Sequence, residues 1–133
     1  MTVQYSTTVR NAKLDAVETA IGTSAIMKIR TGSVPANCAA ADSGTVVATL
    51  NLPSDWMANA SGAVKGLSGV WQDSSADATG TAAHFRIYDS GGSTCHIQGT
   101  VSTSGADLIV DNTSFNAGQA FSVTAFNLTA GNP

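Results

Sequence analysis

Residues 84–101 read HFRIYDSGGSTCHIQGTV, and this stretch decides the fold prediction. Phe85 and Ile87 alternate with polar neighbours, and the same period of two runs from Cys95 to Val101 beyond the DSGGS segment. This alternation is typical of strands that bury one face. A glycine-rich link of this length usually joins antiparallel neighbours. The stretch therefore predicts an antiparallel β-hairpin.

Further strand signals lie on both sides of the hairpin. The short apolar or alternating segments contain Met27 and Ile29, residues 46–50, Leu67 with Val70 and Trp71, Leu108 with Val110, and residues 120–129. Seven or eight short strands at fairly even spacing are typical of an antiparallel β-sandwich or jelly roll, with a barrel as the alternative. The alternation switches phase at Phe126, which predicts a β-bulge in the last strand.

A single amphipathic helix is expected over residues 8–21. Leu14, Val17 and Ile21 form its apolar stripe, Thr7 or Thr8 can cap its start, and Gly22 can end it. Alanines 12, 16 and 20 repeat beside the stripe, and Asn11, Asp15 and Glu18 are expected on the opposite face. Such a helix is marginal alone, so it must dock, either on its own sheet or on a neighbouring subunit. The predicted organisation is an N-terminal arm and helix over residues 1–23, followed by a β-sandwich domain over residues 24–133.

The composition suggests a sparsely charged surface. The chain has 133 residues, of which 11% are charged, and a net charge of −3, whereas soluble domains average roughly 25% charged residues. The six basic residues are scattered, which disfavours nucleic-acid binding. No apolar run suggests a membrane span or a leader peptide. Lys28 and Arg30 share one strand face, which is expected to be exposed.

Few residues form a pattern that suggests chemistry. His84 and His96 could approach each other across the hairpin, but two histidines without further ligands are expected to be surface imidazoles. Asp73 and Asp77 lie in a segment that lacks the ligand density of a calcium loop. No Gly-x-Ser-x-Gly elbow is present, and aspartates beside turns usually bond their own backbone. We therefore expect no enzyme activity, no metal and no cofactor.

The two cysteines and a long loop form a separate feature. Residues 33–45 are nearly uncharged, and they need a surface to pack against if they are to be ordered. Cys38 lies in this loop and Cys95 in the hairpin. Buried free thiols are the expected state, and a Cys38–Cys95 disulfide that forms in oxidising surroundings is the alternative.

Protein contacts are the remaining expectation. Aromatic residues belong in the core by default, but Trp56 follows a proline turn among polar neighbours and could anchor an interface. The candidate interface residues are Leu14, Ala16, Val17, Ala20, Ile21, Pro35, Leu52, Pro53, Trp56 and Met57.

Segments throughout the chain resemble small virion structural proteins of tailed bacteriophages and prophages, most of all capsid decoration (cement) proteins. The segments that resemble them are NAKLDAVETAIG (11–22), CAAADSG (38–44), LPSDW (52–56), residues 80–88 and TCHIQGT (94–100). The resemblance implies a non-enzymatic subunit that is made in the host cytoplasm and located on the capsid surface of the virion. Its implied partners are the major capsid protein and further copies of itself, as a homodimer or homotrimer that gains strength from multivalent contact. A tail fibre-associated or receptor-binding module is the alternative, and a small virion-associated hydrolase is a remote one.

Overall fold

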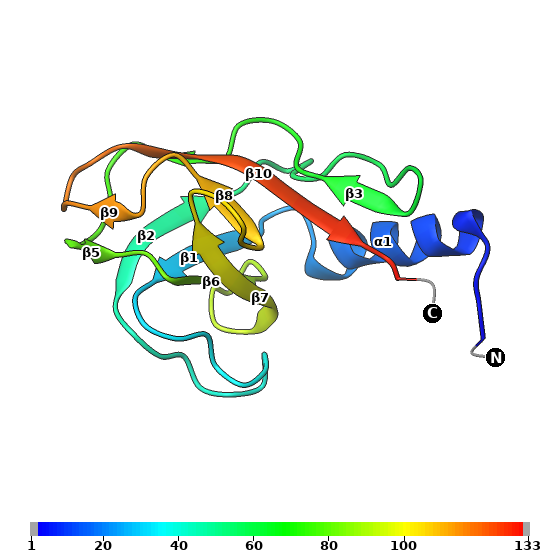
Figure 1. The fold of residues 1–133 in the computed structure, drawn as a ribbon, viewed down its shortest axis with the longest axis horizontal. Helices are drawn as coiled ribbons and strands as arrows, with labels where there is room; N and C mark the ends of the chain where they lie inside the picture. Colours follow the sequence, from blue (N-terminus) through cyan, green and yellow to red (C-terminus); the bar gives the residue numbers. More distant parts are fainter. Residues whose placement is uncertain (1–2, 132–133) are drawn as a thin grey trace.

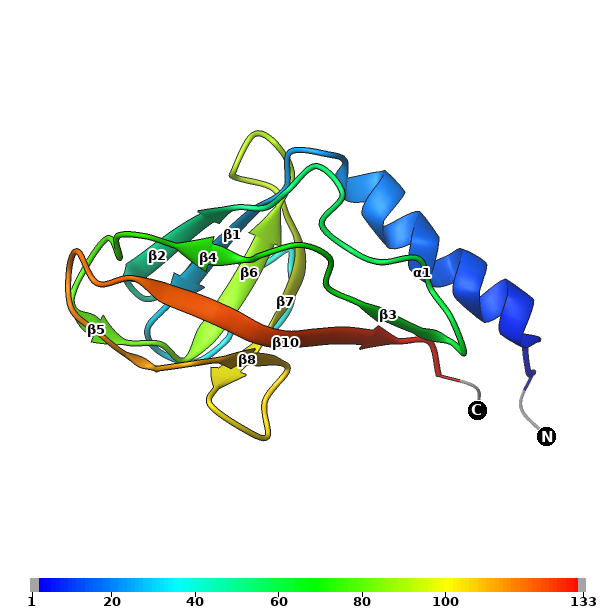
Figure 2. The same ribbon diagram turned by 90° about the horizontal axis from the view of Figure 1, so that it is seen from above.

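The computed structural model describes residues 3–131 of the chain. Its elements in chain order are α1 Thr7–Ile21, β1 Ile26–Arg30, β2 Val46–Asn51, β3 Val64–Gly66, β4 Gln72–Asp73, β5 Gly80–Thr81, β6 His84–Tyr88, β7 Cys95–Ser102, β8 Leu108–Val110, β9 Ser114–Phe115 and β10 Phe121–Thr129. In Figures 1 and 2, the strands form a curled body from which α1, β3 and the end of β10 extend side by side. The prediction of a mainly β protein with one N-terminal helix is confirmed.

The described strands form one eight-stranded sheet and a separate β5–β9 pair. The sheet follows the order β2-β1-β6-β7-β8-β10-β3, with β4 also paired to β10, and all pairs are antiparallel except β7–β8. The sheet curls until the segment after β4 reaches β2, where Asp77 N donates to Val47 O at 2.8 Å. A curled sheet is therefore established, whereas the narrower prediction of a two-sheet sandwich or jelly roll is not confirmed by this strand order.

The hairpin prediction is confirmed, because β6 and β7 pair antiparallel with His84 opposite Thr100 and Tyr88 opposite Cys95. The predicted bulge is confirmed as well, since the register of β10 against β8 shifts between Val123 and Ala125. The prediction of a strand through Leu67, Val70 and Trp71 is wrong. The chain leaves the sheet between β3 and β4, with Val70 67% exposed and Trp71 turned into the core.

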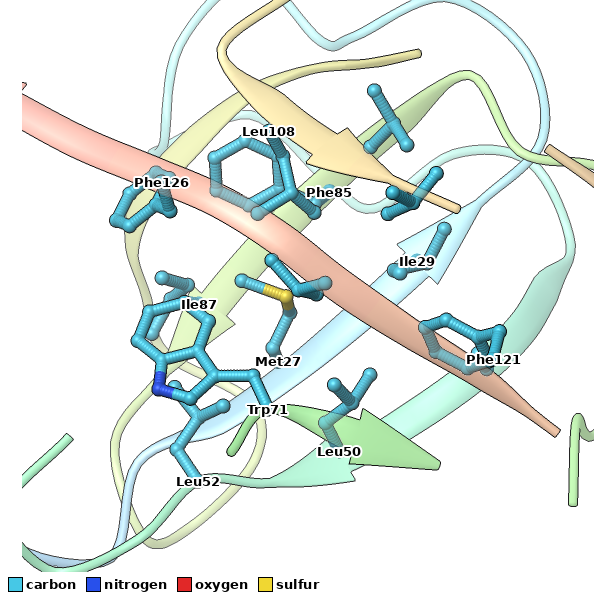
Figure 3. Close-up of a cluster of buried hydrophobic side chains, with 14 of the residues drawn as sticks. Met27, Ile29, Leu50, Leu52, Trp71, Phe85, Ile87, Leu108, Phe121 and Phe126 are labelled. Carbon is cyan, nitrogen blue, oxygen red and sulfur yellow. The ribbon is translucent and has the colours of Figure 1, made fainter. Parts of the chain in front are cut away.

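The core fills the inside of the curl, where apolar side chains from opposite walls meet (Figure 3). Phe85 of β6 meets Phe126 of β10 edge to face, with ring centroids 5.5 Å apart. The centroid of the Trp71 ring lies 5.4 Å from that of Phe126 and 6.0 Å from that of Trp56. Offset and edge-on ring pairs stabilise a core beyond the area that they bury. The default expectation that the tryptophans belong to the core is therefore confirmed.

The parallel pairing of β7 with β8 is unusual, because residues 103–107 alone connect the two strands. Parallel neighbours usually need a crossover of a dozen residues or more. Here Asp107 Oδ2 accepts hydrogen bonds from Thr100 N at 2.9 Å and Thr100 Oγ1 at 3.1 Å, which holds the short link against β7. Gly99 makes room for this contact, since a Cβ atom there would lie 2.7 Å from the same carboxylate oxygen.

Helix α1 begins one residue earlier than predicted, and its cap is Ser6, whose Oγ accepts from Val9 N at 3.2 Å. The prediction of Thr7 or Thr8 as the cap is therefore wrong. Both threonines lie inside the first turn of the helix. Gly22 ends the helix as predicted, with a φ of 98° and its N–H donating to Glu18 O.

The polar residues of α1 dock the helix onto residues 57–63 of the same chain. Asn11 Oδ1, Asp15 Oδ1 and Glu18 Oε2 accept hydrogen bonds from the backbone N–H groups of Ala63, Ala60 and Met57, at 2.8, 2.9 and 3.1 Å. The prediction that these three side chains face away from the docked side is wrong. At about 100° per residue they flank Leu14, whereas Ala12, Ala16 and Ala20 are exposed.

A buried lysine reinforces this contact. Lys65 of β3 is 1% exposed, and its Nζ lies 2.7 Å from Asp15 Oδ1, 3.1 Å from Glu18 Oε1 and 2.9 Å from Ala58 O. Burial would lower the pKa of Lys65, but the hydrogen bonds to Asp15 and Glu18 outweigh it and raise that pKa above 10.5. Of the two docking modes left open by the sequence, the structure shows the helix on its own chain.

Replacing Lys65 with methionine is expected to lower the free energy of unfolding by about 3 kcal/mol, because it leaves two carboxylates without their shared cation. This value is at the lower end of the cost of breaking a buried ion pair, since the Asp15 carboxylate still reaches solvent. Urea unfolding followed by circular dichroism measures the loss. As a control, Lys13→Met removes an exposed cation that lies 4.4 Å from the centroid of the Tyr5 ring, and it is expected to cost about 1 kcal/mol or less. Equal effects of the two substitutions would contradict this role of Lys65.

Candidate functional site

The outer face of β6 carries the main polar cluster of the described residues. Every residue of β6 is buried, although Phe85 and Ile87 point into the core while Arg86 and Tyr88 point the other way. The cover on this outer side is the loop of residues 31–45, drawn in cyan in Figure 1, which leaves β1 and returns to β2. The expectation that this long loop needs a surface to pack against is met here. We call Arg30, Asp42, Arg86, Tyr88 and Gln98 the loop-anchor cluster.

Arg86 is the centre of the loop-anchor cluster and is 2% exposed. Its Nη1 donates to Asp42 Oδ1 at 2.8 Å and to Ala40 O at 3.0 Å. Its Nη2 donates to Asn37 O and Gln98 Oε1, both at 2.9 Å, and its Nε also donates to Gln98 Oε1. A planar guanidinium can hold several acceptors at fixed angles. Arg86 thus binds three points of the loop to the sheet.

Asp42 is the acidic partner at the middle of the loop. It accepts from Tyr88 Oη at 2.7 Å and from Arg30 Nη2 at 3.1 Å, in addition to Arg86. Burial raises the pKa of Asp42, but the hydrogen bonds from Tyr88 and Arg86 outweigh this and hold it below 3.8. Burial, followed by the bond to Asp42, raises the pKa of Tyr88. The earlier expectation that Arg30 lies on an exposed strand face is wrong, because the loop covers it.

The loop-anchor cluster makes acid stability sensitive to Asp42. A carboxylate with a lowered folded-state pKa stabilises the fold above its unfolded-state pKa, and this stability is lost as pH falls through the folded-state value. We expect loop protection in hydrogen exchange to be constant from pH 7 to 5 and to fall below about pH 4. The loss is at most about 1 kcal/mol, because Asp42 is 37% exposed and water screens it.

The matched control for the acid effect is Asp42→Asn. Asp15 also has a lowered pKa, owing first to its hydrogen bond with Lys65. The loss of global stability in acid therefore includes contributions from both carboxylates. The difference in loop protection between Asp42→Asn and the unchanged protein isolates the contribution of Asp42. An Asp42→Asn variant whose loop protection still fell below pH 4 would contradict the assignment.

The return of the loop to β2 depends on one glycine. Gly44 has a φ of 73°, and a Cβ atom there would lie 1.9 Å from Thr31 O. Thr31 and Thr45 close the base of the loop, with Thr31 N donating to Thr45 O at 3.0 Å and Thr45 N to Thr31 Oγ1 at 2.9 Å. Only glycine fits this left-handed conformation next to a backbone oxygen.

Both cysteines lie beside the loop-anchor cluster. Cys38 and Cys95 are half-buried free thiols that line a surface cavity of about 620 Å³ together with Asp42 and Arg86. The thiol of Cys95 donates to Ile97 O at 3.4 Å. Burial, followed by the interaction with the neighbouring Cys38 side chain, raises the pKa of Cys95 to about 12. The fold therefore brings together two thiols that are far apart in the sequence.

The two histidines do not meet. His84 is buried and paired with Thr100, and its Nδ1 lies 2.8 Å from Gly32 O, so Nδ1 carries the proton of this bond. His96 is exposed, with its Nε2 3.2 Å from Asp89 Oδ2. The expectation of two surface imidazoles is thus wrong for His84, because the 31–45 loop covers that side of the sheet. Within residues 3–131, no group of three or more His, Cys, Asp or Glu residues could hold a metal ion.

The aspartates hold turns and link strands. Asp73 Oδ1 accepts from Ser75 N in its own turn, and Asp77 Oδ2 accepts from Thr49 Oγ1 at 2.7 Å, which joins the segment after β4 to β2. Asp89 and Asp111 accept from the backbone N–H groups of Gly91 and Ser122. The expectation that aspartates beside turns bond their own backbone is confirmed at Asp73 and Asp89, whereas Asp77 and Asp111 link separate segments.

Half of the ten candidate interface residues lie in the protein's own core. Leu14, Ile21, Leu52, Trp56 and Met57 are all buried, which leaves little of their surface for a partner in this conformation. Val17, Pro35 and Pro53 are half-buried, whereas Ala16 and Ala20 are exposed on α1. Trp56 is covered because α1 ends against it, and its Nε1 donates to Gly22 O at 3.0 Å.

Inspection of the sequence missed the loop-anchor cluster as a unit. The polar residues of β6 alternate with apolar ones as they would on a solvent-facing side, so Arg86 gave no sign of burial. The usable signal was the nearly uncharged segment of residues 33–45, which needed a surface to pack against. A hairpin with large polar side chains on its outer face offers such a surface.

Searches of protein-family models, curated proteins and solved structures find no match to this chain. Among residues 3–131, no helix has both the length and the apolar character that crossing a bilayer requires.

Proposed function

We propose that this chain is a non-enzymatic structural protein of a tailed-phage particle. Specifically, it is a decoration (cement) protein that binds the major capsid shell as a homo-oligomer. The observation that carries the proposal is how the protein uses its charges. Three of its six cations, Arg30, Lys65 and Arg86, are buried in ion pairs within the fold. The surface is left with small polar side chains and few charges.

A sparsely charged surface suits close packing of many identical copies. Copies of one chain carry the same net charge, here −3, so their mutual repulsion increases with that charge. Small polar side chains also cost less to desolvate than ions when two subunits meet. The loop-anchor cluster supports the same proposal, because its polar groups bind one another and the loop, as in a structural network.

We further propose that the curled sheet is a distorted sandwich or jelly roll, with β2-β1-β6-β7 facing β8-β10-β4. The edge-on contact between Phe85 and Phe126 supports this, because it joins the two walls across the core. The short parallel β7–β8 pairing would then be the corner between the walls. An experimental structure with continuous ladders around the whole circumference would contradict the sandwich and indicate a barrel.

Counting copies in purified particles tests the proposal. Quantitative mass spectrometry is expected to find the chain at a fixed ratio to the major capsid protein and in comparable numbers. Particles that lack it are expected to release DNA at lower temperature than complete ones. A few copies confined to the tail would instead support a fibre-associated or receptor-binding module. Absence from particles, or turnover of a cell-wall substrate by the purified protein, would overturn the proposal.

The outer face of α1 is the first surface to test for shell binding. The double substitution Ala16→Glu and Ala20→Glu keeps good helix formers on exposed positions, so folding is expected to be retained. Rebinding to particles stripped of the protein is expected to weaken by about tenfold or more, as when charges enter an apolar contact. Ser104→Glu, exposed in the β7–β8 link, is the control. Equal rebinding of both variants would exclude this face.

A further inference from the structure

The turn that carries Cys38 is held in a defined position over the sheet. Asn37 Oδ1 accepts from Ala39 N at 2.9 Å and from Ala40 N at 3.0 Å, which closes the turn around Cys38. Arg86 then binds both ends of this turn, through Asn37 O at 2.9 Å and Ala40 O at 3.0 Å. The backbone on either side of Cys38 is therefore tied to a buried side chain of β6.

Cys95 is equally well placed on the sheet. It is the first residue of β7 and lies opposite Tyr88 of β6, two residues along the strand from Arg86. Cys38 and Cys95 line the same surface cavity, and the Cys38 side chain is close enough to contribute to the raised pKa of Cys95. Because both side chains line one cavity and both backbones are held, the fold presents the two thiols to each other.

We propose that Cys38 and Cys95 form an intramolecular disulfide when the folded protein meets an oxidising thiol–disulfide couple such as oxidised glutathione. The bond is a covalent lock that joins the 31–45 loop to β7 beside the loop-anchor cluster. The inference does not depend on the proposed function, because it concerns the isolated chain.

The reaction proceeds by two exchanges. A thiolate of Cys38 attacks oxidised glutathione, forms a mixed disulfide and releases one glutathione thiolate. The thiolate of Cys95 then attacks the Cys38 sulfur and releases the second glutathione. In total, the protein loses two protons and two electrons, and oxidised glutathione takes up both to become two glutathione molecules. The first attack is assigned to Cys38, because Cys95, with its raised pKa, is rarely ionised at neutral pH.

The lock has a thermodynamic consequence. Residues 38 and 95 are separated by 57 positions (95 − 38), so the bond closes a long loop in the unfolded chain. The oxidised protein is therefore expected to melt about 5–15 °C above the reduced one. By linkage, folding also favours the disulfide. The folded chain is expected to form it at a ratio of oxidised to reduced glutathione that is at least roughly thirtyfold lower than the ratio the urea-unfolded chain requires.

The test oxidises the purified full chain with a series of glutathione ratios, blocks free thiols with iodoacetamide and measures intact mass. The expected product has lost two hydrogens, takes no label and yields a peptide pair containing Cys38 and Cys95. Cys38→Ser and Cys95→Ser are the controls and are expected to lack both the bond and the rise in melting temperature; Cys38→Ala and Cys95→Ala replace them if a serine variant fails to fold. Two labelled thiols, a persistent glutathione adduct or a disulfide-linked dimer in the unchanged protein would overturn the proposal.

Discussion

Arg86→Met is expected to lower the free energy of unfolding by about 4 kcal/mol, a large fraction of the roughly 5–15 kcal/mol of a typical domain. The substitution keeps an unbranched side chain of moderate size but removes every hydrogen bond that Arg86 donates to Asp42, Gln98 and the carbonyls of Asn37 and Ala40. Buried acceptors that lose their donors bear the full cost of desolvation. Urea unfolding measures the change in stability, and hydrogen exchange is expected to show selective loss of protection in residues 31–45.

The control for Arg86→Met is Lys28→Met on the same outer face of the sheet. Lys28 donates to Gly92 O at 3.1 Å and lies over the Tyr88 ring, and it makes no bond to the 31–45 loop. Its loss is expected to cost about 1 kcal/mol or less, with the loop still protected. If both substitutions had the same cost, the stability would come from positive charge on this face and not from the bonds of Arg86 to the loop.

Trp56→Ala is the second substitution with a large expected effect, a loss of about 4 kcal/mol in the free energy of unfolding. The indole is fully buried, packs 6.0 Å from the Trp71 ring by centroid distance, and donates to the carbonyl of Gly22 at the end of α1. The substitution leaves a cavity between the helix and the curled sheet. Thermal unfolding of the isolated protein measures the effect.

The same substitution separates two roles for Trp56. If Trp56 were mainly an anchor for a partner, Trp56→Ala would leave the isolated protein as stable as before and weaken only binding. Trp56→Phe, which keeps most of the ring volume and loses the bond to Gly22, is expected to cost about 1–2 kcal/mol. As a surface control, Val70→Ala at a largely exposed position is expected to cost less than about 0.5 kcal/mol.

The parts of the fold that could be predicted are those set by local periodicity. The β6–β7 hairpin, the strand around Met27 and Ile29, the bulge in β10 and the end of α1 at Gly22 each depend on neighbouring residues and one turn. The strand predicted at Leu67, Val70 and Trp71 failed because an apolar residue can stay exposed, as Val70 does, or enter the core without joining a ladder, as Trp71 does. The parallel β7–β8 pair was also beyond local reasoning, since its short link is held by the bonds between Asp107 and Thr100.

The loop-anchor cluster could not be predicted, because alternation reports only that a strand has two different faces. Whether the polar face meets water or another part of the chain depends on contacts such as Arg86 to Ala40, which are 46 positions apart. The same limit explains the error on α1. Asn11, Asp15 and Glu18 have the composition of a solvated face, yet they accept backbone hydrogen bonds from residues 57–63. Polar side chains bury readily when a partner is available.

The attachment of α1 through acceptors of backbone N–H groups determines its position along its axis. An apolar stripe tolerates sliding, because one hydrocarbon contact replaces another at small cost. Asn11, Asp15 and Glu18 each meet a particular amide, and a shift by one residue would break all three bonds together. We therefore expect α1 to move together with residues 57–63 and β3, so that a load applied to the exposed side of the helix passes to that segment.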